Sequence, residues 1–284
     1  MGSPGLRPDQ ARSLGKMIEE WTGIIAGEGR LELLDDHMRP LLETFECEDY
    51  RELIEMARSS AAQVRDAIVD AITTNETSWF RDAGLFDELR RRILPELLAL
   101  RGGAGAGLDI WSAACSTGQE PYTIAMVVHE IARLGEVPGL RPESVRILAT
   151  DISSEVLAVA EAGRFDQVAL GRGLSADLRA RYFHEDGRLH RVDPKLRRMI
   201  RFLRLNLTEA GPGASRMDLI LLRNVLIYFS EERRRAVLEA AHRTLRAGGV
   251  LLLGGAETAG CASDLFEAVY APGAMYYRKR PGTD

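Results

Sequence analysis

The stretch LDIWSAACSTGQEP, residues 108–121, begins with an apolar run and then changes abruptly to small and polar residues. The run from Leu108 to Ala114 is typical of a buried β-strand, and Pro121 suits the first turn of a helix because its missing N–H costs nothing there. A turn between a strand and a helix is where α/β proteins bind nucleotides and cofactors. The stretch therefore contains either a cofactor loop or an ordinary strand-to-helix turn.

The loop residues argue against a nucleotide phosphate. Gly118 is the only glycine, so neither a G-x-G-x-x-G pattern nor a P-loop is present. The preceding residues, including Ala114, are small, which lets the backbone approach a ligand closely, and Gly118 can adopt a positive φ. Glu120 would repel a phosphate but could accept hydrogen bonds from a cationic or hydroxyl-bearing ligand. A phosphate-free cofactor is favoured, and a plain turn remains the alternative on spacing alone.

The chain after residue 107 alternates predicted strands with predicted helices. Such alternation predicts a parallel α/β sheet with its ligand crevice at the carboxyl ends of the strands. Further strands are predicted for VRILATD (145–151), MDLILLRN (217–224) and VLLLGGAE (250–257), and helices for 121–134, 154–163 and 231–249.

Two segments depart from this alternation. Residues 182–202 have mixed β-like character and a turn signal at Asp186-Gly187, so we expect a small antiparallel insertion there. AMYYRK (274–279) is expected to add an antiparallel edge strand.

The first 74 residues show only helical periodicity, as in Leu14, Met17, Ile18 and Trp21. The turn-forming cluster TTNET (73–77) then interrupts the helices, and another helix is predicted from Ala83 to Leu100. We expect an all-α domain over 1–74 and an α/β domain over 75–284.

Composition excludes several classes of protein. A formal net charge of −5 argues against a general nucleic-acid binder. Three cysteines lack CxxC spacing and five histidines do not cluster, so neither a disulfide framework nor a metal site is expected. No apolar run approaches the length of a membrane span, and the N-terminus has no signal-peptide core. We expect a cytoplasmic protein that does not insert into a membrane.

Polar side chains follow several predicted strands. Asp151 ends one strand, where a carboxylate can accept hydrogen bonds from ribose hydroxyls. It could instead cap the following helix, as could Ser153. Asn206, Arg223 and Asn224 follow other apolar runs. Because the carboxyl ends of parallel strands share one crevice, these side chains predict an adenosine-type pocket.

Five segments, in this order, resemble the signature of CheR-type chemotaxis protein methyltransferases. They are TTNETSWFRD (73–82), WSAACSTGQEPYTIAM (111–126), ATDIS (149–153), LNLTE (205–209) and RNVLIYF (223–229). The resemblance extends from about residue 10 to about residue 280. It implies a Rossmann-like methyltransferase domain with a small antiparallel insertion, preceded by the all-α domain. It also implies transfer of a methyl group from S-adenosyl-L-methionine to receptor glutamates, leaving S-adenosyl-L-homocysteine.

The resemblance assigns roles to particular residues. Asp151 is expected to bind the ribose, and Asn206 and Leu207 to flank the adenine. The expected catalytic residues are Arg81, orienting the incoming carboxylate or that of the cofactor, and Tyr228, shaping the path of the methyl group. No general base is needed, because a glutamate with a reference pKa of about 4.3 is ionised at neutral pH. The expected cofactor-binding set is Asn75, Thr77, Arg81, Ala114, Gly118, Glu120, Asp151, Asn206, Leu207, Arg223 and Asn224.

The implied partner is the cytoplasmic helical domain of a methyl-accepting chemotaxis receptor, bound by a monomeric enzyme. In related proteins the second N-terminal helix tends to be basic, whereas residues 30–50 here hold two basic and seven acidic residues. The segment from Arg188 to Arg204 carries seven Arg or Lys and one acidic residue. It is either a docking face or simply a solvated basic surface. Alternatives for the whole chain are a non-catalytic signalling scaffold and a methyltransferase acting on a protein outside chemotaxis.

Overall fold

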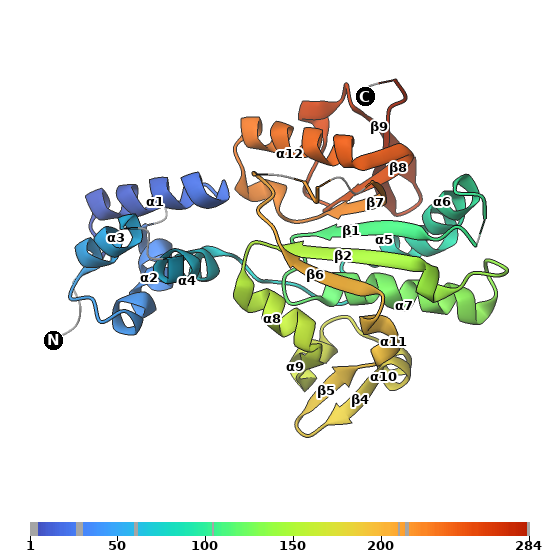
Figure 1. The fold of residues 1–284 in the computed structure, drawn as a ribbon, viewed down its shortest axis with the longest axis horizontal. Coiled ribbons are helices and arrows are strands. Elements are labelled where there is room, and N and C mark those ends of the chain that lie inside the picture. Colours follow the sequence, from blue (N-terminus) through green and yellow to red (C-terminus); the bar gives the residue numbers. More distant parts are fainter. Residues whose placement is uncertain are drawn as a thin grey trace.

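The structure is a computed structural model that describes residues 5–26, 31–59, 62–103, 105–209, 211–213 and 216–282. These residues form a helical N-terminal part and a larger α/β part (Figure 1). Parts of both predicted domains lie outside the described residues: 1–4, 27–30, 60 and 61 of the first, and 104, 210, 214, 215, 283 and 284 of the second.

The N-terminal part contains four helices among the described residues, as the apolar periodicity predicted. Leu14, Ile18, Met38, Leu53 and Ile68 have no exposed surface and pack into one core. The helices are α1 (Pro8–Thr22), α2 (Leu31–Thr44), α3 (Tyr50–Arg58) and α4 (Ala62–Ile72).

The α/β part is built on a seven-stranded sheet with the order β6-β2-β1-β7-β8-β10-β9. Five strands are parallel: β1 (Leu108–Ala113), β2 (Val145–Asp151), β6 (Ile200–Arg204), β7 (Met217–Leu222) and β8 (Leu245–Leu253). The last two, β9 (Phe266–Ala271) and β10 (Ala274–Lys279), run antiparallel to their neighbours. The predicted Rossmann-like α/β fold is confirmed.

Helices cover both faces of this sheet (Figure 1). Alternate residues of β1 point to opposite cores, with Ile110 facing α7 and Trp111 facing α12. The first face carries α5 (Ala83–Glu88), a π-helical turn (Leu89–Ile93), α6 (Leu94–Leu100), α7 (Gln119–Leu134) and α8 (Ser154–Ala162), and the second carries α12 (Glu231–Thr244).

A second, three-stranded antiparallel sheet lies on the far side of α7 and α8 from the first (Figure 1), with the order β3-β5-β4. It contains the expected hairpin across Asp186-Gly187, together with one strand that the sequence did not predict, β3. Its elements are β3 (Arg164–Phe165), α9 (Gln167–Gly171), α10 (Ala176–Tyr182), β4 (Phe183–Asp186), β5 (Leu189–Val192) and α11 (Pro194–Arg197).

The expected end of this insertion at residue 202 is wrong. Residues 200–204 form β6, which pairs in parallel with β2 at the edge of the main sheet. Ile200 and Phe202 point into the main core, and the ring of Phe202 lies 6.0 Å from that of Tyr122. The alternating apolar pattern therefore belongs to the sheet rather than to the insertion.

Two predictions for the C-terminal part of the chain, the helix at 231–249 and the edge strand at 274–279, are partly wrong. The helix predicted for 231–249 ends at Thr244, because Leu245 already begins β8 and Gly248, with φ +74°, lies within that strand. AMYYRK is antiparallel as expected but is not the edge, since β9 lies outside it. Short 3-10 turns occur at Pro142–Ser144, Leu226–Tyr228 and Gly260–Ala262.

The helical part meets the α/β part at the carboxyl end of the sheet. The amide of Ile25 donates to the carbonyl of Tyr228 at 2.9 Å. The side-chain amide of Asn206 donates to the carbonyl of Trp21 at 2.8 Å. Both contacts border the same pocket.

Candidate active site

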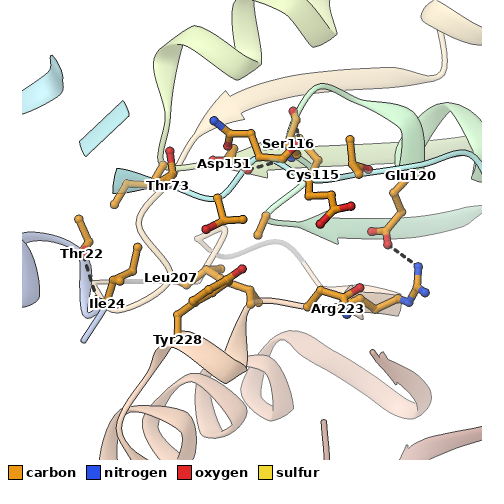
Figure 2. Close-up of a pocket in the computed structure, with 18 of the residues that line it drawn as sticks. Thr22, Ile24, Thr73, Cys115, Ser116, Glu120, Asp151, Leu207, Arg223 and Tyr228 are labelled. Atoms are coloured by element: carbon orange, nitrogen blue, oxygen red, sulfur yellow. Dashed lines mark hydrogen bonds and ion pairs between the residues drawn. The ribbon is translucent and has the colours of Figure 1, made fainter. Parts of the chain in front are cut away.

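A pocket of about 1020 Å³, counting the solvent at its mouth, lies at the carboxyl ends of the parallel strands. Figure 2 shows Ser116, Asp151 and Glu120 on one side and Arg223 and Tyr228 on the other. Thr22 and Ile24, from the end of α1 and the segment after it, also line it. The helical part and the α/β part therefore both contribute to the wall of this pocket.

The pocket brings together nearly all of the predicted site residues. Gly118 is the exception: it lies at the start of α7 with φ +95°, and a Cβ there would be 2.9 Å from the Cβ of Ala160. Its lack of a side chain lets the loop pack against α8. The predicted residues that do line the pocket are Asn75, Thr77, Arg81, Ala114, Glu120, Asp151, Asn206, Leu207, Arg223, Asn224 and Tyr228.

The cofactor loop adopts left-handed conformations without glycine. Ala114 has φ +58° and Ser116 has φ +49°, a region that costs an L-residue about 1–2 kcal/mol. Hydrogen bonds hold this shape: the amide of Ser116 donates to Asp151 Oδ2 at 2.9 Å, and its hydroxyl donates to the carbonyl of Asn75 at 3.1 Å. The loop is therefore fastened both to the end of β2 and to the segment before α5.

Asp151 is not the cap of the next helix. Ser153 caps α8 by accepting from the amide of Val156, whereas Asp151 Oδ1 accepts from the amide of Ser153 at 3.0 Å. Burial raises the pKa of Asp151, and the amides of Ser153 and Ser116 oppose that shift. A carboxylate offers about four lone-pair sites, so Asp151 retains acceptor capacity for ligand hydroxyls.

Glu120 is paired within the protein. Its Oε1 accepts from the hydroxyl of Ser112 at 2.7 Å, and its Oε2 accepts from Arg223 Nη1 at 2.9 Å (Figure 2). Arg223 Nη2 also donates to Asp82 and to the carbonyl of Arg81. Arg223 Nε is buried and has no partner among the described residues, so a ligand acceptor at this point would satisfy a costly unpaired donor.

Comparison with known proteins agrees with this geometry. The model of the CheR methyltransferase, SAM binding domain, matches residues 75–274. The chain belongs to the CheR methyltransferase family. It is 39% identical over 266 residues to chemotaxis protein methyltransferase 1 of Pseudomonas aeruginosa, covering 92% of this chain and 95% of that one. It is also 39% identical to the chemotaxis protein methyltransferase of Vibrio anguillarum, covering 94% and 96% of the two chains.

The cofactor of this CheR-family protein is S-adenosylmethionine, and the pocket residues fit it. It has no phosphate, in keeping with a loop that lacks a phosphate-binding glycine pattern. Asp151 can accept from its ribose hydroxyls, and Arg223 Nε can donate to an acceptor such as its carboxylate. Within the described residues, no cluster of His, Cys, Asp and Glu could hold a metal ion, and no helix is long and apolar enough to cross a membrane.

The side chain of Asn206 makes four hydrogen bonds within the protein. Its Nδ2 donates to the carbonyl of Trp21 and to Glu209, and its Oδ1 accepts from the amide and hydroxyl of Thr208. These four bonds use its full hydrogen-bonding capacity. Asn206 therefore joins the pocket wall to the helical part of the CheR chain, and its side-chain amide has no group left for the adenine.

Three residues in or behind the pocket wall were not predicted from the sequence: Thr22, Ile24 and Glu257. Thr22 and Ile24 reach the pocket only because α1 ends against the 225–229 segment, and no local pattern indicates that contact. Glu257 is buried behind the pocket wall. The sequence offers one indication of Glu257, a carboxylate that closely follows an apolar strand. The same pattern pointed to Asp151 as a site residue.

Proposed function

We propose that this protein transfers the methyl group of S-adenosylmethionine to glutamate side chains in the cytoplasmic helical domain of a chemotaxis receptor. The products are glutamate methyl esters and S-adenosylhomocysteine, and the enzyme acts as a cytoplasmic monomer. Support comes from membership of the CheR family and from relatives that are named chemotaxis protein methyltransferases. The similarity to these relatives covers most of both chains.

The observation that carries the choice of acceptor is the lack of a free general base in the pocket. No histidine or lysine lines the described pocket. Glu120 is paired with Arg223, Asp151 is bound by two backbone amides, and Glu76 pairs with Arg172 at 3.1 Å. An amine or alcohol acceptor must lose a proton during the reaction, whereas a glutamate carboxylate is already ionised at neutral pH.

The thiol of Cys115 does not change this conclusion. Cys115 is 2% exposed, and burial raises its pKa well above the ordinary value. It therefore stays protonated at neutral pH and cannot take a proton from an acceptor.

The work of the pocket residues is alignment. The bound cofactor supplies a methyl group on a cationic sulfur, and the acceptor oxygen must approach that carbon in line with the carbon–sulfur bond. Arg81 is held by its Nη1, which donates to the carbonyl of Glu76 at 3.2 Å, and its charge orients a carboxylate. Tyr228 limits the approach from the wall that also carries Arg223 (Figure 2). Orientation of this kind lowers the activation barrier by up to about 7–11 kcal/mol in the best intramolecular cases.

We further propose that the receptor docks on arginines at the edge of the main sheet. Much of the basic segment 188–204 is paired internally, as in Arg191 with Asp186 and Arg204 with Asp66. Arg198 and Arg201 are exposed and have no side-chain partner among the described residues. They line a shallow, open groove together with Ile200 and Phe202. The acidic α2 cannot offer this attraction to an acidic receptor helix.

The proposal is tested with purified receptor cytoplasmic fragment and methyl-labelled S-adenosylmethionine. The expected result is label in the receptor that mild base releases as methanol, because an ester is base-labile. A protein that binds the cofactor but transfers no label is a signalling scaffold. Label transferred only to another protein of a lysate assigns the enzyme to a different pathway.

A further inference from the structure

The carboxylate of Glu257 accepts four hydrogen bonds from backbone amides behind the pocket wall. Only 6% of its surface is exposed. Its Oε2 accepts from the amides of Asn224 at 2.7 Å and Gly254 at 2.8 Å. Its Oε1 accepts from the amides of Val225 at 2.8 Å and Leu226 at 2.7 Å. One carboxylate thus joins the end of β8 to three consecutive residues that follow β7.

These three residues begin the segment that carries Tyr228. Asn224 has φ +58°, a left-handed conformation that needs support in a residue with a side chain. The 3-10 turn Leu226–Tyr228 starts two residues later, after Val225, and the first amides of such a turn have no partner within the turn. The carboxylate of Glu257 satisfies these amides and compensates for the strained residue.

The same segment contacts the helical part of the chain. The carbonyl of Tyr228 accepts from the amide of Ile25 at 2.9 Å, and Phe229 bridges to Ile24. A shift of the 224–228 segment would therefore displace Asn224 and Tyr228 in the pocket and also alter the seam between the two parts.

We propose that Glu257 is a positioning residue for the cofactor pocket, holding Asn224 and Tyr228 in the wall through four backbone N–H groups. Glu257 does not line the pocket itself. This role of Glu257 affects cofactor binding and does not depend on which protein accepts the methyl group.

The direct test is Glu257→Gln, with Glu267→Gln as the matched control. Glutamine replaces one acceptor oxygen by an NH₂ group that faces backbone donors, whereas Glu267 is exposed on β9 and makes no side-chain hydrogen bond among the described residues. S-adenosylhomocysteine binding is measured by calorimetry well below the melting temperature. We expect affinity to fall about 10-fold in Glu257→Gln, in line with hydrogen bonds to a charged group, and to be unchanged in Glu267→Gln.

Amide hydrogen exchange separates positioning from general destabilisation. Positioning predicts faster exchange confined to residues 224–228, with β8 and β10 still protected. Faster exchange throughout β8 and β10, in proportion to the lost affinity, would mean that Glu257 only stabilises the fold and would overturn the proposal.

Gly254→Ala gives an independent test if Glu257→Gln fails to fold. A Cβ at Gly254 would lie 2.7 Å from Asn224 Nδ2 and 2.8 Å from Glu257 Oε2, so it would push the anchor and the wall apart without removing a charge. We expect the same loss of affinity and the same local exchange. Wild-type affinity with wild-type exchange at 224–228 in this variant would contradict the proposal.

Discussion

Arg223 Nη1 donates to Glu120 Oε2 at 2.9 Å, and only 2% of the Arg223 side chain is exposed. A buried guanidinium therefore lies in the wall of the cofactor pocket and is compensated by Glu120 and Asp82. The same side chain therefore holds the acidic loop residue, and its Nε is a buried donor without a partner among the described residues.

Arg223→Met should destabilise the protein and abolish detectable cofactor binding. Breaking a buried ion pair from one side costs about 3–5 kcal/mol, because the remaining charge is left uncompensated. Arg223→Lys should fold better but bind the cofactor weakly, since an ammonium cannot span Glu120 and Asp82 in a planar fork. Urea denaturation and calorimetry with S-adenosylhomocysteine measure both effects. Arg188→Met, at an exposed arginine without a side-chain partner in the described chain, is the control, and equal losses there would contradict the assignment.

Gly118→Ala should reveal a packing requirement rather than a ligand contact. The methyl group would meet Ala160 at 2.9 Å, so overpacking of about 1–3 kcal/mol adds to the cost of a positive φ. Gly135→Ala is the matched control, because Gly135 also has a positive φ, at the end of α7, but no atom lies within 4 Å of its added Cβ. Urea denaturation should show the larger loss of unfolding free energy for Gly118→Ala. Equal losses in the two variants would mean that contact with α8 is unimportant.

The attachment of the small sheet should depend on pH through Glu130. Burial alone would raise the pKa of Glu130, but hydrogen bonds from Arg133, Tyr182 and Arg181 lower it to about 2. Because the pKa of Glu130 is lower in the folded state than in the unfolded state, where it is near 4.5, Glu130 stabilises the protein at any pH above about 4.5. This stabilisation is lost as the pH falls from about 4.5 to about 2. Glu130→Gln should reduce unfolding free energy at neutral pH and flatten its decline over this range.

Glu185→Gln is the control for that experiment. Glu185 lies on β4 of the same small sheet, is exposed, and makes no side-chain hydrogen bond in the part of the chain that the structure describes. It should retain the wild-type acid profile. A Glu130→Gln profile that parallels the wild type would show that this contact does not govern acid stability.

Charge reversal should separate receptor docking from cofactor binding. In the double variant Arg198→Glu with Arg201→Glu, we expect the KM for the receptor fragment to rise about 10-fold or more, because like charges at an interface cost several kcal/mol. The affinity for S-adenosylhomocysteine should not change. The control reverses Arg91 and Arg141, two exposed arginines that also lack side-chain partners among the described residues. An unchanged KM, or an equal rise in both double variants, would place docking elsewhere.

The sequence predicted the pocket well because its residues occupy positions that the fold forces together. Asp151, Asn206 and Asn224 lie at the ends of different strands, and the carboxyl ends of parallel strands border the same crevice. The family resemblance then added Arg81 and Tyr228, which belong to segments without a strand pattern of their own.

What the sequence did not reveal depends on contacts between distant segments. Gly118 looked like a ligand-loop glycine, but its conformation serves packing on Ala160. The apolar alternation at Ile200 and Phe202 is the same for a hairpin and for a parallel edge strand, so only the pairing with β2 distinguishes them. The partners of Glu257 are backbone amides, which leave no mark on the sequence.

Base-labile methyl transfer to a receptor tests the central claim most directly. The purified protein, methyl-tritiated S-adenosylmethionine and a receptor cytoplasmic fragment are incubated, and the volatile label released by mild base is counted. The account predicts methanol release that disappears when the acceptor glutamates are replaced by alanine and that falls sharply with Arg81→Ala. Cofactor binding without any base-labile label in the receptor fragment, or label that resists base, would contradict it.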